Sequence, residues 1–277
     1  MSFSLVLNQS NSIPNTNNTQ FEYKFIGGNF KADDMEVCVT QAVVPYSWFN
    51  VSSQLGNNKL TVQWVSGGAT PIIFPDGFYT IASINAYLQQ ISITEGWYLI
   101  NASGNYVYYI SIIENATFYA NQVILSAVPS SLPTGFTAPS NFAGFSVGGE
   151  CVSMTFPVGS ISAIVGFPVG TVIPSIVGSQ SVLSTITPQG STVNAVIIRS
   201  NFVDNNVVSP NDILDSFSIN SAFGSNINYT PSFPRYLPIA NGVYSTFRIA
   251  LFDEVLNPII AKDNRSLFNL HIRKVKR

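Results

Sequence analysis

The sequence predicts an all-β protein, an antiparallel jelly-roll sandwich with one short helix and long loops. Apolar residues recur with the two-residue period of strands over most of the chain. Turn-forming residues separate these short segments, and only one segment shows helical spacing. Without a series of helices to cover a parallel sheet, we expect antiparallel strands in two packed sheets. About eight to ten such strands suit a jelly roll.

Three segments alternate most clearly, 35–44, 59–64 and 246–251. Their predicted core faces are apolar, and the opposite faces are more polar, as expected of half-buried strands. The predicted core residues are Met35, Val37, Val39, Val43, Leu60, Val62, Trp64, Phe247, Ile249 and Leu251. Further strands are expected near 20–25, 97–101, 121–127, 151–156, 192–199, 213–219 and 267–275. The segment 106–113 is apolar on both faces and predicts one strand covered on both sides.

The helical segment follows the turn at 75–77. Its apolar residues are spaced by three, four and three positions, which places them on one stripe of a helix at about 81–91. They are Ile81, Ile84, Leu88 and Ile91. Thr80 is the expected N-cap, and Asn85, Gln89 and Gln90 are expected to face water.

The domain organisation predicted from the sequence is simple. Residues 1–30 form an N-terminal arm or a first strand, and residues 31–277 form a single jelly-roll domain. An insertion or long loop excursion is expected around 128–190. The proline and glycine residues of 128–150 make that region the candidate neck of such an insertion.

Charge is scarce in this chain. Only 9% of the residues are charged and the formal net charge is −2. No lysine or arginine occurs between Leu60 and Ile198, where the acidic residues are Asp76, Glu95, Glu114 and Glu150. Such a composition offers no field for nucleic acid or an anionic membrane. An uncharged polar surface over many strands suits a protein that packs against copies of itself.

The remaining composition excludes other classes. Two cysteines, Cys38 and Cys151, cannot form a disulfide scaffold and are expected to be buried reduced thiols. The N-terminus shows no signal peptide, so synthesis in the cytoplasm is expected. The apolar stretch 161–177 contains glycines and prolines that break a membrane-spanning helix, so buried strands joined by turns are expected there.

No residue pattern points to catalysis. The one histidine, His271, lies in a strand-like run with no acid or nucleophile near it in sequence. One histidine and two distant cysteines do not make a zinc site. The acidic cluster at Asp33, Asp34 and Glu36 lacks the spacing of a calcium loop. We therefore expect no enzyme activity, no cofactor, no metal and no small-molecule substrate. Aromatic residues look most exposed at Tyr46, Trp48 and Phe49.

The C-terminus carries half of the chain's basic residues within its last sixteen positions. They are Lys262, Arg265, Arg273, Lys274, Lys276 and Arg277. Two interpretations stay open. The bases form a solvated tail that keeps the protein soluble, or they contact nucleic acid or an acidic neighbour in an assembly. We keep all six as candidate assembly or nucleic-acid contacts.

Several segments, in order over about 35–275, resemble the penton (minor capsid) proteins of virophages, polinton-like viruses and related large eukaryotic DNA viruses. The segments are 43–51, 74–80 with the helix that follows, 164–167, 196–203 with 210–217, and 242–259. One departure is Ile164-Val165-Gly166-Phe167, where these proteins carry a leucine before the glycine. Residues 1–30 match nothing in this group.

The resemblance implies a single jelly roll, five copies of which close a ring at each vertex of an icosahedral particle. It implies no enzymatic residues, a virion localisation, and contact with the major capsid protein of the same particle. One alternative stays open, since jelly rolls also occur as binding modules. That alternative is a lectin-like or host-attachment protein displayed on a particle surface.

Overall fold

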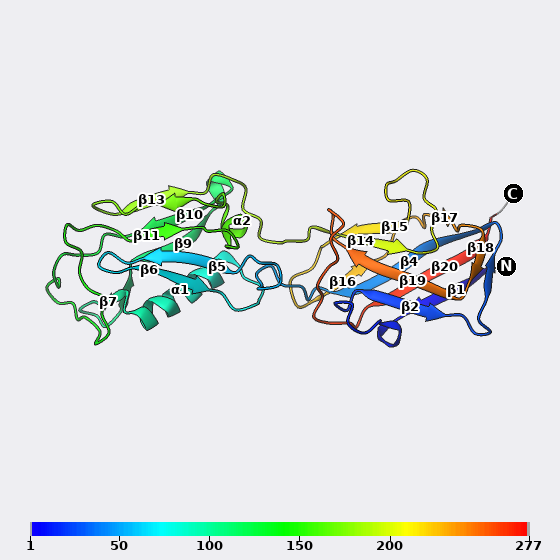
Figure 1. Ribbon diagram of the computed structural model, residues 1–277, viewed down its shortest axis with the longest axis horizontal. Coiled ribbons are helices and arrows are strands. Elements are labelled where there is room, and N and C mark those ends of the chain that lie inside the picture. Colours follow the sequence, from blue (N-terminus) through cyan, green and yellow to red (C-terminus); the bar gives the residue numbers. More distant parts are fainter. Residues whose placement is uncertain (1, 276–277) are drawn as a thin grey trace. The chain divides into compact units, whose positions relative to one another are not determined.

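The computed structural model describes residues 2–275, and it divides the chain into two compact units. Unit 1 combines Met1–Trp48 with Val193–Arg277, and unit 2 is Phe49–Thr192 (Figure 1). The second unit is thus inserted into the first. These boundaries differ from the single domain expected at 31–277. The insertion or long loop expected around 128–190 covers only the latter part of unit 2. The chain enters unit 2 directly after strand β4, long before the glycine- and proline-rich region.

Unit 1 contains two main antiparallel sheets. The first has the order β1 (Ser2–Leu7), β20 (Leu267–Lys274), β4 (Met35–Pro45) and β16 (Asn226–Tyr229), with β17 (Leu237–Pro238) also paired to β4. The second has the order β15 (Ile213–Ser218), β14 (Ala195–Ser200), β19 (Thr246–Phe252) and β2 (Gln20–Lys24). A separate two-stranded antiparallel sheet pairs β3 (Phe30–Ala32) with β18 (Gly242–Tyr244).

The order of these strands is that of a jelly roll. Apart from the short strands β3, β17 and β18, the chain supplies β1, β2, β4, β14, β15, β16, β19 and β20 in turn. Each successive strand lies in the other sheet, except for the neighbours β14 and β15. Two four-stranded sheets linked in this way form the double Greek key of a jelly roll. The predicted fold class is confirmed, with unit 2 inserted between the third and fourth of these eight strands.

Alternating apolar residues explain how the sheets of unit 1 pack. On β20, the side chains of Phe268, Leu270 and Ile272 are fully buried. On β19, those of Phe247, Ile249 and Leu251 are buried in the same way. Phe21 and Phe268 meet with ring centroids 5.3 Å apart. The predicted face of β4 changes halfway, because a register shift opposite Asn269 and Leu270 inserts Thr40. After this irregularity Ala42 and Val44 are buried in place of the predicted Val43.

Unit 2 contains two further antiparallel sheets and the helices. One sheet has the order β12 (Val172–Ile173), β11 (Ser153–Thr155), β5 (Lys59–Gln63) and β6 (Ala69–Ile73). The other has the order β13 (Gln180–Leu183), β10 (Ala120–Leu125) and β9 (Ile110–Asn115). Strands β7 (Tyr98–Ile100) and β8 (Tyr106–Tyr108) pair separately. Helices α1 (Ile81–Glu95) and α2 (Ser162–Val165) complete the unit.

Helix α1 confirms the predicted stripe and cap. Thr80 accepts a hydrogen bond from the Ser83 amide, and Ile81, Ile84 and Leu88 are buried. The helix continues one turn beyond the prediction because Gly96, at φ 71°, ends it in a left-handed conformation. Asn85 differs from expectation, since its Oδ1 accepts a hydrogen bond from the Ile112 amide of β9.

Two other local predictions differ from the structure. The segment 106–113 is divided between β8 and β9, which belong to different sheets, and Tyr106 and Ile113 are exposed. The expected exposed aromatic group is largely buried: Tyr46 is 5% exposed and Trp48 is 3% exposed. These two rings contact each other with centroids 4.7 Å apart. Both cysteines are buried free thiols, as predicted.

Candidate functional site

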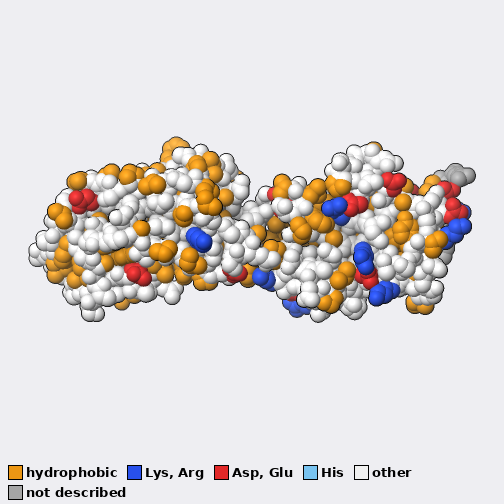
Figure 2. All heavy atoms as spheres, in the orientation of Figure 1, with side chains coloured by type: hydrophobic (Ala, Val, Ile, Leu, Met, Phe, Trp, Pro, Cys, Tyr) orange, Lys and Arg blue, Asp and Glu red, His pale blue; other side chains and the backbone are white. Residues whose placement is uncertain are grey.

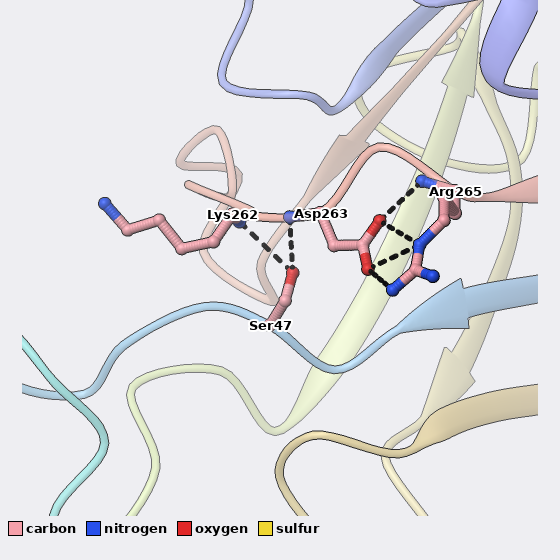
Figure 3. A network of polar contacts seen from close by, with 4 residues as sticks. All are labelled: Ser47, Lys262, Asp263 and Arg265. Atoms are coloured by element: carbon pink, nitrogen blue, oxygen red, sulfur yellow. Dashed lines mark hydrogen bonds and ion pairs between the residues drawn. The ribbon is translucent and has the colours of Figure 1, made fainter.

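The C-terminal basic residues were the only candidate site found in the sequence, and the structure separates them into groups. Arg265 binds Asp263, with Nη2 2.5 Å from Oδ2 and Nε within 3.0 Å of both carboxylate oxygens (Figure 3). These bonds lower the pKa of the Asp263 carboxyl. Ser47 Oγ accepts hydrogen bonds from the backbone amides of Lys262 and Asp263 (Figure 3). Arg265 is therefore paired within this turn, whereas the exposed Lys262 side chain extends away from the Asp263–Arg265 pair (Figure 3).

Arg273 is held in a second place, on strand β20. Its Nε donates a hydrogen bond of 2.5 Å to Glu36 Oε1 on the neighbouring strand β4. Its guanidinium also lies 3.4 Å from the ring centroid of Tyr236, a cation–π contact. The charge of Arg273 is thus balanced within its own unit. Lys274, the next residue, is exposed.

The four candidates that the structure describes therefore do not form one continuous site. Lys276 and Arg277 lie outside the described residues, directly after the exposed Lys274 and Val275. The sequence revealed the cluster of basic residues but not their acidic partners. The partner of Arg273, Glu36, is distant in sequence, and nothing in the sequence marked Asp263 as the partner of Arg265. Among the described candidates outside these two ion pairs, Lys262 and Lys274 are exposed.

His271 sits in a hydrogen-bonded chain on the outer face of β20. Its Nε2 lies 2.7 Å from Ser2 Oγ, and its Nδ1 lies 2.7 Å from the Tyr236 hydroxyl. A serine beside a histidine resembles a nucleophile and its base. Here, however, the third group is a phenol whose pKa is raised by burial, so it stays neutral instead of supplying the negative charge that stabilises an imidazolium.

The thiol of Cys38 lies in the same region but is inaccessible. Its side chain is fully buried, and burial raises the pKa of the thiol above its usual value. A reactive cysteine needs the opposite, a lowered pKa and solvent access. This region therefore ties the N-terminal strand β1 to β20 through Ser2 and His271, and it has the character of a structural network.

Charge is distributed very unequally between the two units. Unit 2 contains one basic residue, Lys59, and four acidic ones, Asp76, Glu95, Glu114 and Glu150. On the face drawn in Figure 2, its surface is mostly white and orange, with few blue or red side chains. The remaining charged residues belong to unit 1. A contact that buries the surface of unit 2 would therefore remove few charged side chains from water, so the desolvation cost would be small.

Two negative findings concern residues 2–275. No three histidine, cysteine or acidic side chains come close enough together to hold a metal ion. In the same part of the chain, no helix has the length and apolar character required to cross a membrane.

Strand β1 is an edge strand with an unusual surface. Among the described strands it pairs only with β20, and its sequence Ser2–Leu7 contains neither a charged residue nor a proline. Natural proteins usually protect such edges with lysine, proline or a covering segment. Strand β2, an edge strand of the second sheet of unit 1, is protected in this way by the segment that precedes it. In that segment Ser12 forms a β-bridge with Phe21, and Asn11 Nδ2 donates a hydrogen bond to the Glu22 carbonyl. The edge of β1 is therefore suited to contact another chain.

Comparisons with known proteins give structural matches only. No protein-family model matches the sequence, and neither does any curated protein. The chain is similar to the crystal structure of the selenomethionine-labelled mavirus penton protein, with a TM-score of 0.44 and 10% identity over 99% of both chains. It is also similar to a chain of the Sputnik virophage structure determined by cryo-EM. That match has a TM-score of 0.39 and 11% identity over 99% of this chain and 97% of the other. With TM-scores below 0.5, these matches alone assign neither fold nor function.

Proposed function

We propose that this chain is a structural capsid protein that forms the pentameric vertex of an icosahedral virus particle. One observation carries the proposal: unit 1 is a jelly roll whose interior is filled by its own side chains. Phe21, Phe247 and Phe268 are completely buried between the two sheets. A jelly roll that holds a small ligand between its sheets needs space there. A filled jelly roll is instead suited to serve as a rigid building block.

The surfaces of the two units support this role. In a closed ring every subunit uses two different patches, one for each neighbour. The uncharged edge of β1 provides one surface for such a contact. Unit 2 provides polar, nearly uncharged surface, which can be buried against a neighbour with little ionic desolvation. The sequence segments that resemble penton proteins also favour this assembly.

The proposal includes the partners and the location of the protein. The partners are further copies of the same chain and the major capsid protein that surrounds the vertex. The protein then resides in the virion, and it is not an enzyme. Nothing in the His271 network supplies the charged third group that nucleophilic catalysis by Ser2 would use.

The first prediction tests the ring directly. We expect purified protein at high concentration to form pentamers, visible as fivefold rings in electron micrographs and as the matching mass in native mass spectrometry. Ring contacts can be weak in isolation, because the surrounding shell also holds each subunit by multivalent contact. A particle structure is therefore the decisive measurement. Density for this chain at a threefold or sixfold position would contradict the proposal.

The second prediction concerns the exposed end of the basic tail. We propose that Lys274, Lys276 and Arg277 contact nucleic acid or an acidic neighbour inside the particle. Reversing all three charges to glutamate is expected to leave folding unchanged, because Phe268, Leu270 and Ile272 hold β20 in the core. Incorporation into particles should fall. The plot of log K against log salt concentration for binding to a short DNA duplex should become less steep, with its slope reduced in magnitude by about three.

A matched control has the same change of charge. Lys24, Lys31 and Lys59 are exposed lysines elsewhere in the chain, and their triple replacement by glutamate alters the net charge equally. This control should incorporate normally. If both triple variants incorporate as well as the original protein, the tail is only a solvated segment. If both fail equally, net charge rather than the tail determines assembly.

A further inference from the structure

Unit 2 contains a cavity that the assembly role does not use. Its volume is about 390 Å³, and it lies between the start of α1, the connection from β9 to β10, and the segment 188–190. Ile81 and Ile164 contribute apolar lining, and Glu114, Asn121 and Tyr119 contribute polar and aromatic lining. The volume falls at the small end of the range for pockets that bind small molecules, about 300–1,000 Å³.

Asn121 is the most informative residue of this cavity. It is only 3% exposed, and its Nδ2 donates hydrogen bonds to the carbonyls of Ile164 and Val165, at 3.4 and 3.1 Å. These two acceptors fix which side of the amide carries the nitrogen. Its Oδ1 accepts no hydrogen bond from any residue between 2 and 275. The oxygen keeps access to solvent, since among the described residues the buried side-chain atoms without a partner are Trp48 Nε1 and Ser160 Oγ, so it can accept from water or from a ligand.

Two more acceptors lie beside Asn121. Glu114 is directly opposite Asn121 in the pairing of β9 with β10, and Asn115 is opposite Ala120. The Glu114 carboxylate is exposed and forms no ion pair or hydrogen bond with the part of the chain that the structure describes. Asn115 Nδ2 donates to Gln122 Oε1 at 3.0 Å, which leaves its Oδ1 to accept. Side chains opposite each other on paired strands are close, so one ligand in the cavity could reach the acceptors of both Glu114 and Asn121.

Tyr119 adds an aromatic surface in an unfavourable backbone conformation. Its φ is 50°, in the left-handed region that favours glycine, and its side chain is 77% exposed. Burial of the ring therefore does little to offset the backbone cost. A tyrosine at this position is better explained by what its exposed ring contacts, because strained residues concentrate at functional sites.

We propose that this cavity binds a neutral pyranose ring of a glycan. A sugar offers several hydroxyl donors to the acceptors of Glu114, Asn115 and Asn121, and its apolar face of C–H groups can stack on Tyr119. No lysine or arginine lines the cavity, and a carboxylate does, so anionic sugars are disfavoured. Such a site would let the chain recognise a glycosylated surface. The site needs no second subunit, since all its lining residues belong to one chain.

The experiment uses the full chain and defined sugars. The probes are methyl α-D-mannopyranoside, methyl β-D-galactopyranoside and N-acetylglucosamine, with N-acetylneuraminic acid as the anionic comparison. Binding is measured by saturation-transfer NMR and by titration. We expect at least one neutral sugar to bind saturably with a Kd of about 1–10 mM, and N-acetylneuraminic acid to bind at least about tenfold more weakly.

The variants locate the binding. Tyr119→Ala and Glu114→Gln should each weaken the binding at least about fivefold. Phe118→Ala is the matched control, because Phe118 is the adjacent exposed aromatic residue but does not line the cavity. It should bind as the original chain does. All three variants change exposed side chains, and unchanged thermal unfolding confirms that they fold.

Three results would overturn the proposal. The first is the absence of saturable binding by all three neutral sugars up to about 100 mM. The second is binding that persists unchanged in both Tyr119→Ala and Glu114→Gln, which would place the sugar elsewhere. The third is equal binding of N-acetylneuraminic acid, which would exclude recognition by the Glu114 carboxylate. None of these results affects the test of the pentamer.

Discussion

Replacement of Leu88 by aspartate is expected to unfold unit 2 at room temperature or to leave it barely stable. Leu88 is 1% exposed and lies on the buried stripe of α1. The substitution removes a large apolar side chain and places a carboxylate without a partner among apolar side chains. We expect a loss of about 5 kcal/mol in the free energy of unfolding. That loss is comparable with the whole stability of many domains, about 5–15 kcal/mol.

The matched control is Ala86→Asp, on the same helix. Ala86 is exposed, so the new carboxylate stays in water and only helix propensity changes. The expected cost is about 0.5–1 kcal/mol. Urea unfolding followed by tryptophan fluorescence measures both variants, because Trp64 and Trp97 are buried in the core of unit 2. Equal midpoints for the two variants would show that α1 does not cover this core.

The strands and the helix were predictable from the sequence because their signals are local. Alternating residues such as Phe268, Leu270 and Ile272 reveal a strand wherever one face is buried. The stripe from Ile81 to Leu88 and the cap at Thr80 reveal α1 for the same reason. The antiparallel jelly roll then follows from the number of strands and the near absence of helices.

The division into two units was not predictable in the same way. Both units are built from short β-strands, so no change of period marks the boundaries after Trp48 and Thr192. The glycine- and proline-rich region 128–150 was a misleading signal. In the structure it is a connection within unit 2, held by contacts such as the hydrogen bond from Trp64 Nε1 to the Gly144 carbonyl at 2.9 Å.

The candidate sites show the same limit. Counting bases identified the C-terminal tail, but the pairing of Arg273 with Glu36 depends on the register of β20 against β4. The cavity beside Tyr119 gave no signal in the sequence, since Glu114 and Asn121 acquire meaning only when β9 pairs with β10. The positive φ of Tyr119 also becomes visible only in the structure.

The second large effect is expected for Gly96→Ala, at the end of α1. Gly96 adopts φ 71°, and a Cβ atom built there would lie 1.9 Å from the Asn141 carbonyl oxygen. The two segments approach so closely because Asn141 Nδ2 caps the helix, donating to the carbonyls of Ile93 and Thr94 at 3.1 and 3.0 Å. The Ala143 amide also donates to the Gly96 carbonyl at 3.1 Å. An alanine would have to displace backbone that is held by these three bonds.

We expect Gly96→Ala to lower the free energy of unfolding by about 3 kcal/mol or more, from left-handed strain plus overpacking. Gly104→Ala is the control that separates the two causes. Gly104 has a similar φ of 81°, but nothing lies within 4 Å of a Cβ built there. Its loss should be about 1 kcal/mol, the cost of the conformation alone. The difference between the two midpoints in urea measures the contact with Asn141. Equal losses would mean that the 141–143 segment moves aside freely and that Asn141 does not fix the end of α1.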